Sequence, residues 1–275
     1  MTDILLLLLL SIPAGLLGAL TGLGGGSIMI PLLVFLGVPV KYAVAASMVT
    51  IIATSSGSAS SYVKERIVNI RAAMYLEMFT MTGAIVGATV TRFIEPRLLY
   101  FFFAAFLLAS FYGIRGHLKE EVPPNVKQDR LSRWLRLEGS YYDQALGRRV
   151  DYRLTRSALG GGGMFVAGIA AGMLGIGAGA FKVSIHELIL RMPSKVSSTT
   201  SNFIIGMTAL AGASVYFASG LLYLDLAAPM AIGTTIGAMA GARILNRFSN
   251  RSIRLLFMVI VLFLVAQMLY KGLIS

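Results

Sequence analysis

Long runs of apolar residues, separated by short polar connections, dominate this 275-residue chain. A helix rises about 1.5 Å per residue, so about 20 apolar residues cross about 30 Å of hydrocarbon. We expect membrane-spanning helices at 42–63, 72–91, 98–114, 196–219, 224–244 and 253–269. The pattern predicts an all-α polytopic membrane protein.

Two glycine-rich stretches interrupt this pattern where a membrane helix would normally continue. The first reads GLGGGSIMIP over 22–31, and the second reads GIGAGAFKVS over 175–184. The apolar arms beside the second stretch, 158–172 and 180–190, would measure about 22 Å and about 17 Å as helices. Because the second arm is too short to span, we expect each stretch to form the tip of a helical hairpin that enters the membrane and turns back.

The second half of the chain repeats the first. An offset of 154 residues, without gaps, aligns Gly18 with Gly172, Gly25 with Gly179, Pro39 with Pro193, Ser47 with Ser201 and Gly83 with Gly237. Self-similarity at a fixed offset indicates a duplication. We therefore divide the chain into a first transmembrane repeat (1–114), a linker insert (115–157) and a second transmembrane repeat (158–275).

The charges between the apolar segments predict that the repeats are inverted relative to each other. The connection 64–71 is basic, whereas its repeat partner 218–225 contains no basic residue. The connection 243–254 is more basic than its partner 90–99. Since Lys and Arg collect on the cytoplasmic side, equivalent connections should lie on opposite faces. Each repeat would then be a broken, re-entrant helical hairpin plus three transmembrane helices, with the insert cytoplasmic and both termini extracytoplasmic.

Composition supports a membrane protein and narrows its function. Hydrophobic residues make up 56% of the chain, charged residues 13%, and the mean hydropathy is +0.78, which is too apolar for a soluble globule. The net charge of +12 comes from residues between apolar segments, so we expect no nucleic-acid partner. Cysteine is absent, which excludes disulfides and thiolate chemistry. No catalytic motif indicates an enzyme, and we expect no cofactor and no metal.

The insert at 115–157 is polar and cannot lie in lipid. RLSRWLRL, at 130–137, predicts a short amphipathic surface helix, and the segment 140–154 alternates like a β-hairpin around a glycine turn. We interpret the insert as a solvated cytoplasmic linker, with a regulatory or ligand-binding role as the alternative.

The candidate binding chemistry gathers at the glycine tips. A new helix begins after each tip, and the first four backbone N–H groups of a helix have no intrahelical acceptor. Together with the helix dipole they attract an anion, which glycine allows to approach closely. We expect one small anion between the two tips near the membrane midplane. Its backbone ligands would come from Gly24, Gly25, Gly26 and Ser27 in the first tip and from Gly177 and Gly179 in the second.

Polar side chains near the tips extend this hypothesis. Lys182 lies at the third position of the second tip helix, where a charge is costly and implies a function or a partner. It either contacts the anion, or snorkels, or pairs with Glu187 or Asp225. Hydroxyl or amide groups that open the spans after the hairpins are further candidate donors, although such hydroxyls commonly bond to their own helix. These candidates are Ser47, Ser201 and Asn202.

Two more titratable residues lie in apolar segments. His186 is either a proton relay or the hydrogen-bonded neighbour of Glu187 near the cytoplasmic end. Glu77 lies less than two turns into its span, so we expect it to snorkel to the cytoplasmic boundary and assign it no role. The small-residue patterns GAIVGA (83–88) and GAMAGA (237–242) predict close helix packing.

Taken together, these motifs resemble the TauE/SafE family of sulfite exporter membrane permeases. The resemblance covers both repeats and rests on GLGGGSIMIP with GVPVKYAVAASM, and on GIGAGAFKVS with MPSKVSSTTSNFIIGMTALAGASVY and GAMAGARI. It implies export of small sulfur oxyanions or organosulfonates across a prokaryotic cytoplasmic (inner) membrane. A family pattern of glycines followed by lysine maps onto Gly177, Gly179 and Lys182. The chain departs from that pattern at Ala178 and at Ser184, which replaces proline.

Our sequence hypothesis is a secondary transporter that exposes one small sulfur-containing anion alternately to the two faces, driven by the anion gradient or by protons. The alternatives are an anion channel, a permease for a non-sulfur carboxylate, and a membrane scaffold whose insert binds a cytoplasmic partner. The expected partners are the anionic substrate and the lipid bilayer. A coupling proton and a homodimer remain open.

Overall fold

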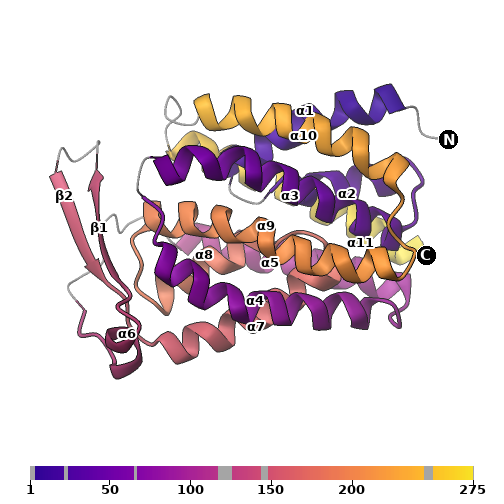
Figure 1. The fold of residues 1–275 in the computed structure, drawn as a ribbon. Coiled ribbons are helices and arrows are strands. Elements are labelled where there is room, and N and C mark those ends of the chain that lie inside the picture. The colour runs from indigo at the N-terminus through magenta and orange to yellow at the C-terminus, as the bar shows by residue number, and fades with distance from the viewer. Residues whose placement is uncertain are drawn as a thin grey trace.

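The computed structural model describes residues 4–21, 24–64, 67–116, 126–143, 148–244 and 250–274 (Figure 1). The first half contains α1 (Ile4–Thr21), α2 (Gly26–Phe35), α3 (Val40–Lys64), α4 (Ile70–Thr91) and α5 (Pro96–Gly116). The insert contains α6 (Arg130–Trp134), β1 (Glu138–Asp143) and β2 (Arg148–Arg153). The second half contains α7 (Ser157–Leu174), α8 (Gly179–Leu188), α9 (Ser194–Ala218), α10 (Leu224–Ile244) and α11 (Asn250–Ile274).

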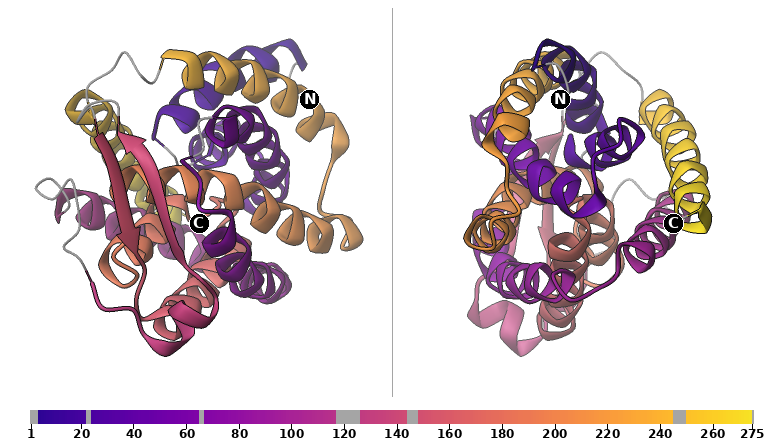
Figure 2. Two further views of the ribbon diagram at one scale, coloured as in Figure 1. Left: turned by 60° about the vertical axis from the view of Figure 1, so that its left-hand side comes forward. Right: turned by 90° about the vertical axis from the view of Figure 1, so that its right-hand side faces the viewer.

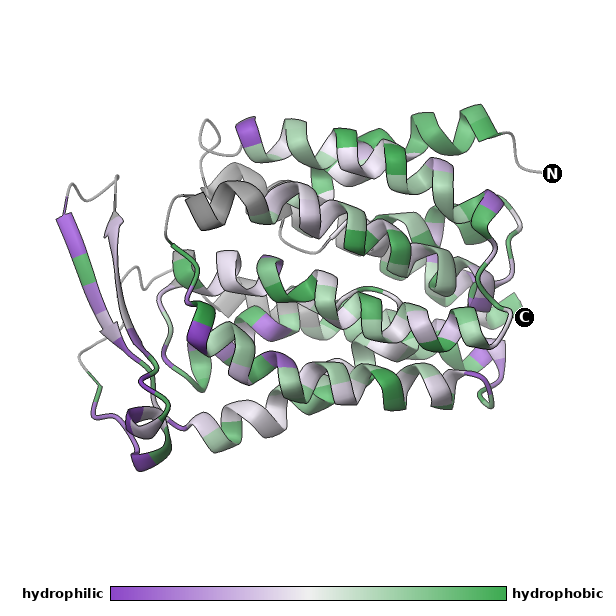
Figure 3. Cartoon of the chain, viewed as in Figure 1, coloured by the Kyte–Doolittle hydropathy of each residue, from purple (hydrophilic) through white to green (hydrophobic). Residues whose placement is uncertain are grey.

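The helical bundle has the properties of a membrane protein. Within the described residues, α3, α4, α7, α9 and α10 are long and apolar enough to span a bilayer. Hydrophobic residues lie along the whole length of the bundle, whereas hydrophilic residues are concentrated in the β-hairpin and the connections (Figure 3). Large apolar side chains such as Met78, Ile232 and Phe263 are exposed on its surface, as lipid contact requires. The prediction of an all-α membrane protein is confirmed.

Helices α3 and α9 cross the centre of the bundle side by side. The Ser55 hydroxyl donates to the backbone carbonyl of Asn202 (2.7 Å) and accepts from the backbone N–H of Gly206 (3.2 Å). Gly212, further along α9, lies against Met48, which is earlier in α3. The two helices therefore run antiparallel.

The small-residue patterns bring outer helices into close contact, as predicted. Helix α7 packs along α4, and α1 packs along α10. A Cβ atom at Gly87 would lie 2.1 Å from the carbonyl oxygen of Ile169, and one at Gly237 would lie 1.9 Å from that of Ile12. Only glycine allows the backbones to approach this closely. Helices α5 and α11 form a further pair at the side of the bundle (Figure 2).

The predicted gapless offset of 154 is wrong for the hairpin regions. The bounds of α1 and α7, and of α2 and α8, differ by 153 residues, whereas those of α3 and α9 differ by 154. Contacts between the helices show the same two offsets. Gly15 lies against the carbonyl of Thr234, and Gly168, 153 residues after Gly15, lies against the carbonyl of Thr80, 154 residues before Thr234. One extra residue between α8 and α9 shifts the register. Gly25 therefore corresponds to Ala178, and Gly26 to Gly179.

The second glycine stretch is the tip of a hairpin, as predicted. Going back from the tip, Ile185 of α8 lies against Gly163 of α7, and Leu190 lies against Gly160. The backbone N–H of Thr155, just before α7, donates to the carbonyl of Leu190, just after α8 (3.2 Å). The two ends of the hairpin therefore lie together. In the first half, Gly18 of α1 lies against Gly25 at the start of α2. Helix α1 begins at the end of the bundle opposite to α7 (Figure 1).

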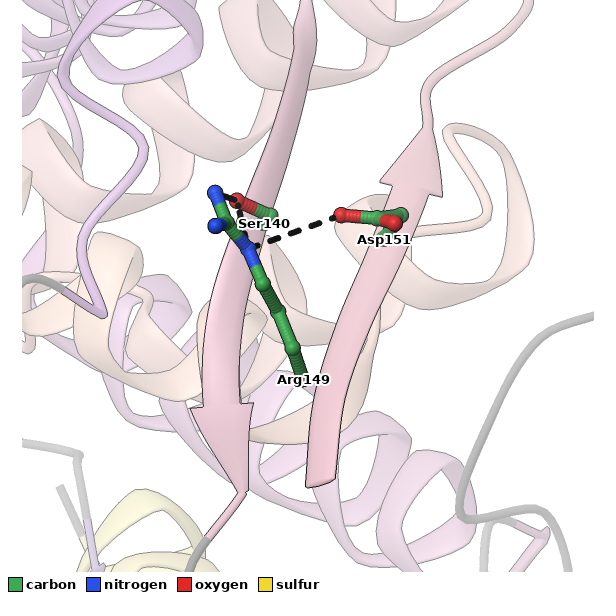
Figure 4. A network of polar contacts seen from close by, with 3 residues as sticks. All are labelled: Ser140, Arg149 and Asp151. Carbon is green, nitrogen blue, oxygen red and sulfur yellow. Dashed lines mark hydrogen bonds and ion pairs between the residues drawn. The ribbon is translucent and has the colours of Figure 1, made fainter.

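The insert forms the predicted short helix and β-hairpin. Strands β1 and β2 are antiparallel, with Tyr141 opposite Val150. The polar side of the hairpin is exposed, and there Arg149 contacts Ser140 and Asp151 (Figure 4). The hairpin lies at the end of the bundle opposite to the two termini (Figures 1 and 2).

The other side of the hairpin is fixed to the bundle. Tyr141, Val150 and Tyr152 pack against Ala72 of α4 and Val196 of α9. The Asn69 amide donates to the Tyr152 hydroxyl (3.1 Å). The same Asn69 side chain caps α4 by accepting from the N–H of Ala72 (3.0 Å). Burial raises the pKa of Tyr152 to about 12, against the opposing effect of the Asn69 hydrogen bond.

Candidate functional site

The two glycine tips meet inside the bundle. All of Gly24, Gly25, Gly26, Gly177 and Gly179 are buried. The Ser27 hydroxyl, in the first turn of α2, donates to the carbonyl of Ile176 in the second tip (3.4 Å). A Cβ atom at Gly26 would lie 3.0 Å from the carbonyl oxygen of Gly175. Two stretches about 150 residues apart in the sequence thus form one site.

The backbone at each tip adopts the left-handed conformation that favours glycine. Gly24 has φ +73°, and Gly177 has φ +66°. Ala178, which interrupts the second glycine run, also has a positive φ, at +51°. An L-residue in this conformation costs about 1–2 kcal/mol, so the second tip carries local strain at the proposed site.

Two isoleucines related by the repeat cover the tips. Gly24 contacts both Ile51 of α3 and Ile205 of α9, and Gly177 contacts the same pair. A Cβ atom at Gly177 would lie 2.5 Å from Ile205 Cγ1. A side chain at Gly177 would therefore collide with Ile205 of the central helix pair.

The tip helices start without a side-chain cap. Helix α2 follows Gly25 and α8 follows Ala178, and within the described structure neither residue caps its helix with a side-chain hydrogen bond. Each helix has ten residues, so its dipole is developed. The first amides of both helices therefore turn positive potential toward the place where the tips meet.

The predicted serine donors lie beside the tips. The Ser47 hydroxyl donates to the carbonyls of Val44 (2.7 Å) and Gly175 (2.8 Å), and the Ser201 hydroxyl donates to the carbonyl of Gly179 (3.3 Å). Asn202 is buried, and its backbone carbonyl accepts from Ser55. The two serine hydroxyls thus connect the backbone of the second tip to α3 and α9.

Lys182 belongs to a fully buried polar network. It is 0% exposed, so it does not snorkel. Its Nζ donates to Thr208 Oγ1 (2.6 Å), and Thr208 Oγ1 donates to Glu77 Oε1 (2.8 Å). Thr80 Oγ1 donates to Glu77 Oε2 (2.7 Å). We call Lys182, Thr208, Glu77 and Thr80 the buried polar network.

The expectation that Glu77 snorkels is wrong. Its side chain is 2% exposed and accepts hydrogen bonds from α4 and α9. Helices α7 and α9 pack against α4 and enclose it. A carboxylate within a span was itself a signal of function, but its partner could not be found from spacing, because Lys182 and Glu77 lie on helices far apart in the sequence.

His186 is also fully buried, one turn after Lys182. Its Nδ1 lies 3.4 Å from the carbonyl oxygen of Ser197. Its Nε2 is buried and has no hydrogen-bond partner among the described residues.

Comparison with known proteins identifies the family. The family model described as "Sulfite exporter TauE/SafE" matches residues 7–268, nearly the whole chain. The chain belongs to the TauE/SafE family. It is similar to "Probable membrane transporter protein YunE" of Bacillus subtilis (strain 168), with 26% identity over 98% of both chains. It is also similar to "Probable membrane transporter protein YdhB" of the same strain, with 28% identity over 90% of both chains.

An archaeal protein is related as well. "Probable membrane transporter protein MJ0441" of Methanocaldococcus jannaschii is 24% identical over 91% of this chain and 90% of its own length. No solved structure gives a significant match. The TauE/SafE membership and the apolar helices together make this protein a multi-pass membrane transporter.

Proposed function

We propose that this TauE/SafE protein is a secondary transporter of small sulfur-containing anions, sulfite or organosulfonates, and that the anion binds where the two glycine tips meet. The observation that carries the proposal is the contact between the buried, uncapped start of α2 and the turn that leads into the uncapped start of α8, marked by the hydrogen bond from Ser27 to Ile176. Two helix dipoles directed at one buried point favour a negative charge there. The family description supplies the sulfur chemistry.

We infer that the two repeats are inverted and that they give alternating access to this point. Helices α1 and α7 begin at opposite ends of the bundle (Figure 1). Helix α1 of the first repeat packs on α10 of the second, and their repeat counterparts, α7 and α4, pack on each other in the same way. Transporters with such repeats place the substrate between broken helices near the midplane and move one part of the bundle against the other. We infer that the insert end is cytoplasmic, because the described part of the basic connection, residues 67–71, lies beside it.

The test is flux of labelled sulfite and sulfoacetate into liposomes that contain the purified protein. Gly26→Val should block it, because a Cβ atom there would lie 2.7 Å from Ile51 and 3.0 Å from the carbonyl of Gly175. Gly162→Ala is the matched control, since that helical glycine of α7 has open space around it. The control should keep wild-type flux.

Three results would overturn parts of this proposal. If wild type moves neither anion, the sulfur substrate class is wrong, and transport of acetate or lactate instead would point to a carboxylate permease. If Gly26→Val folds and transports normally, the site is not at the tips. If the turnover per molecule far exceeds the rate of a conformational cycle, the protein is a channel.

A further inference from the structure

We propose that Glu77 is the proton-binding residue of this transporter and couples anion binding at the tips to proton uptake by competing with the anion for Lys182. The inference rests on the proposed function and adds the coupling ion and its residue. It comes from the buried polar network, in which a lysine, a threonine and a glutamate link α8, α9 and α4.

The hydrogen bonds of the network are directed toward the carboxylate. The Lys182 ammonium has only donors, so Thr208 Oγ1 must accept from it. The Thr208 hydroxyl then has one proton to donate, and its nearest acceptor is Glu77 Oε1 (2.8 Å), ahead of Glu77 Oε2 (3.1 Å) and the carbonyl of Ile204 (3.2 Å). Thr80 donates to Oε2 (2.7 Å). Both carboxylate oxygens accept hydrogen bonds in this arrangement, which suits an ionised Glu77. Lys182 and Glu77 then neutralise each other.

A proton on Glu77 changes this balance. The protonated oxygen becomes a donor and a poorer acceptor, so one of the two threonine hydrogen bonds weakens. The positive charge of Lys182 then lacks its counter-charge in a buried, low-dielectric place, where an unpaired charge is costly. An anion at the tips supplies a new counter-charge. Protonation of Glu77 and anion binding therefore favour each other, and by linkage the effect is reciprocal.

The network lies within reach of the tips. Lys182 is in the first turn of α8, and its backbone N–H bonds to the carbonyl of Ala178 (2.9 Å). Thr208 follows Ile205 by three residues in α9, and Ile205 lies against Gly177. The distance along α9 is therefore less than one turn, or about 5 Å.

The fold does not require these charges. At the corresponding positions of the other repeat stand Met29, Thr54, Ala231 and Thr234, where neither Lys nor Glu occurs. Met29 is fully buried, and the Thr54 hydroxyl bonds to the backbone carbonyl of Thr50 (2.7 Å). The same packing is thus built once without ionisable groups. Buried ion pairs seldom stabilise more than apolar residues of similar size, so we assign the pair to function.

Few other titratable groups face Glu77. Helix α7 contributes none, and in α9 the nearest described group is Tyr216, which donates to the carbonyl of Gly172 (2.8 Å). In α8 the groups besides Lys182 are His186, one turn further on, and the half-buried Glu187. His186 is the alternative proton-binding residue, so the experiment below includes a His186 variant.

The experiment measures sulfoacetate binding to the purified full-length protein as the pH is lowered stepwise from mildly alkaline to mildly acidic. Thermal stabilisation reports affinity, and a pH dye in weak buffer reports proton uptake on binding. For wild type, we expect affinity to rise by about tenfold as the pH falls, with protons taken up. Glu77→Gln should bind tightly at every pH and take up no protons.

Further variants keep the result clear if Glu77→Gln does not fold. Glu77→Gln combined with Lys182→Met removes both charges and restores the Met found in the first repeat, so it should fold, bind weakly and show no pH dependence. Thr208→Val keeps both charges and should reduce the pH dependence. The control is Thr82→Val on α4, whose exposed hydroxyl bonds only to the backbone at Met78 and Phe79 in the described structure.

The outcomes separate the two proposals. If wild type binds sulfoacetate with no pH dependence and no proton uptake, only the coupling role is overturned. The same holds if the double variant keeps the pH dependence, or if His186→Gln abolishes it while Glu77→Gln does not. If wild type neither binds nor transports sulfite, sulfoacetate, acetate or lactate, the proposed function fails, and the coupling role fails with it.

Discussion

Gly177→Ala tests whether the second tip requires glycine for both its backbone and its space. The left-handed φ of +66° would cost an alanine about 1–2 kcal/mol. The new Cβ atom would lie 2.5 Å from Ile205 Cγ1 and 2.6 Å from its Cδ1. Overpacking of this kind costs about 1–3 kcal/mol. We therefore expect the free energy of unfolding to fall by about 2–5 kcal/mol.

The two contributions can be separated. Ile205→Ala removes both atoms that the new Cβ would meet, so Gly177→Ala should destabilise the Ile205→Ala background only by the backbone cost of about 1–2 kcal/mol. The double-mutant cycle should then show a coupling of about 1–3 kcal/mol. The assay is denaturant or thermal unfolding in detergent, with flux in liposomes measured on the same preparations.

The control again uses Gly162, a helical glycine with nothing within 4 Å of an added Cβ atom. Gly162→Ala should be neutral or stabilise the protein by up to about 1 kcal/mol. Equal stability of Gly177→Ala and Gly162→Ala, with equal flux, would refute the argument that the tip is both strained and tightly packed.

Three further predictions concern other parts of the molecule. Ala178→Gly should change the free energy of unfolding by less than about 1 kcal/mol and keep transport. Glycine relieves the strain of the φ of +51°, and this gain offsets the greater freedom of the unfolded chain. A loss of flux would assign a role to the alanine methyl group. Gly87→Ala should lower the melting temperature by several degrees, because its Cβ atom would lie 2.1 Å from the carbonyl oxygen of Ile169, and an unchanged value would contradict the close packing of α4 on α7. Because the folded pKa of Tyr152, about 12, is above the unfolded value of about 10, the hairpin should lose stability as the pH rises between these values, and Tyr152→Phe should remove this dependence. Fluorescence of Trp134, the single tryptophan, reports the change, and identical alkaline profiles for both proteins would contradict it.

The site itself was only partly predictable from the sequence. Lys182 drew attention because a charge inside an apolar segment is unusual. The sequence offers Glu187 and Asp225 as acidic partners for Lys182. In the structure Lys182 instead donates to Thr208, and Thr208 donates to Glu77. The register of the hairpins was missed for a similar reason. Glycines recur so often in these regions that identical letters align at 154, while the backbone aligns at 153.

The sequence by itself determined the features that depend on local physics. Hydrophobic length predicted α3, α4, α9 and α10 as membrane helices, because the bilayer imposes a fixed thickness on every segment. It did not predict α7 as a span, since 158–172 was expected to be one arm of a re-entrant hairpin, and the re-entrant course stays a prediction. Glycine at the tips determined where the backbone could turn.

Only the tertiary structure decided which groups meet at the site. It placed Ile51 and Ile205 over the tips, directed the hydroxyls of Ser47 and Ser201 to tip carbonyls, and enclosed Glu77 beside Thr208. These contacts join helices far apart in the chain, and they depend on how backbones pack at glycine contacts and on the antiparallel crossing of α3 and α9. Hydrophobic periodicity does not encode that geometry, because a lipid-exposed face and a helix-facing side are both apolar.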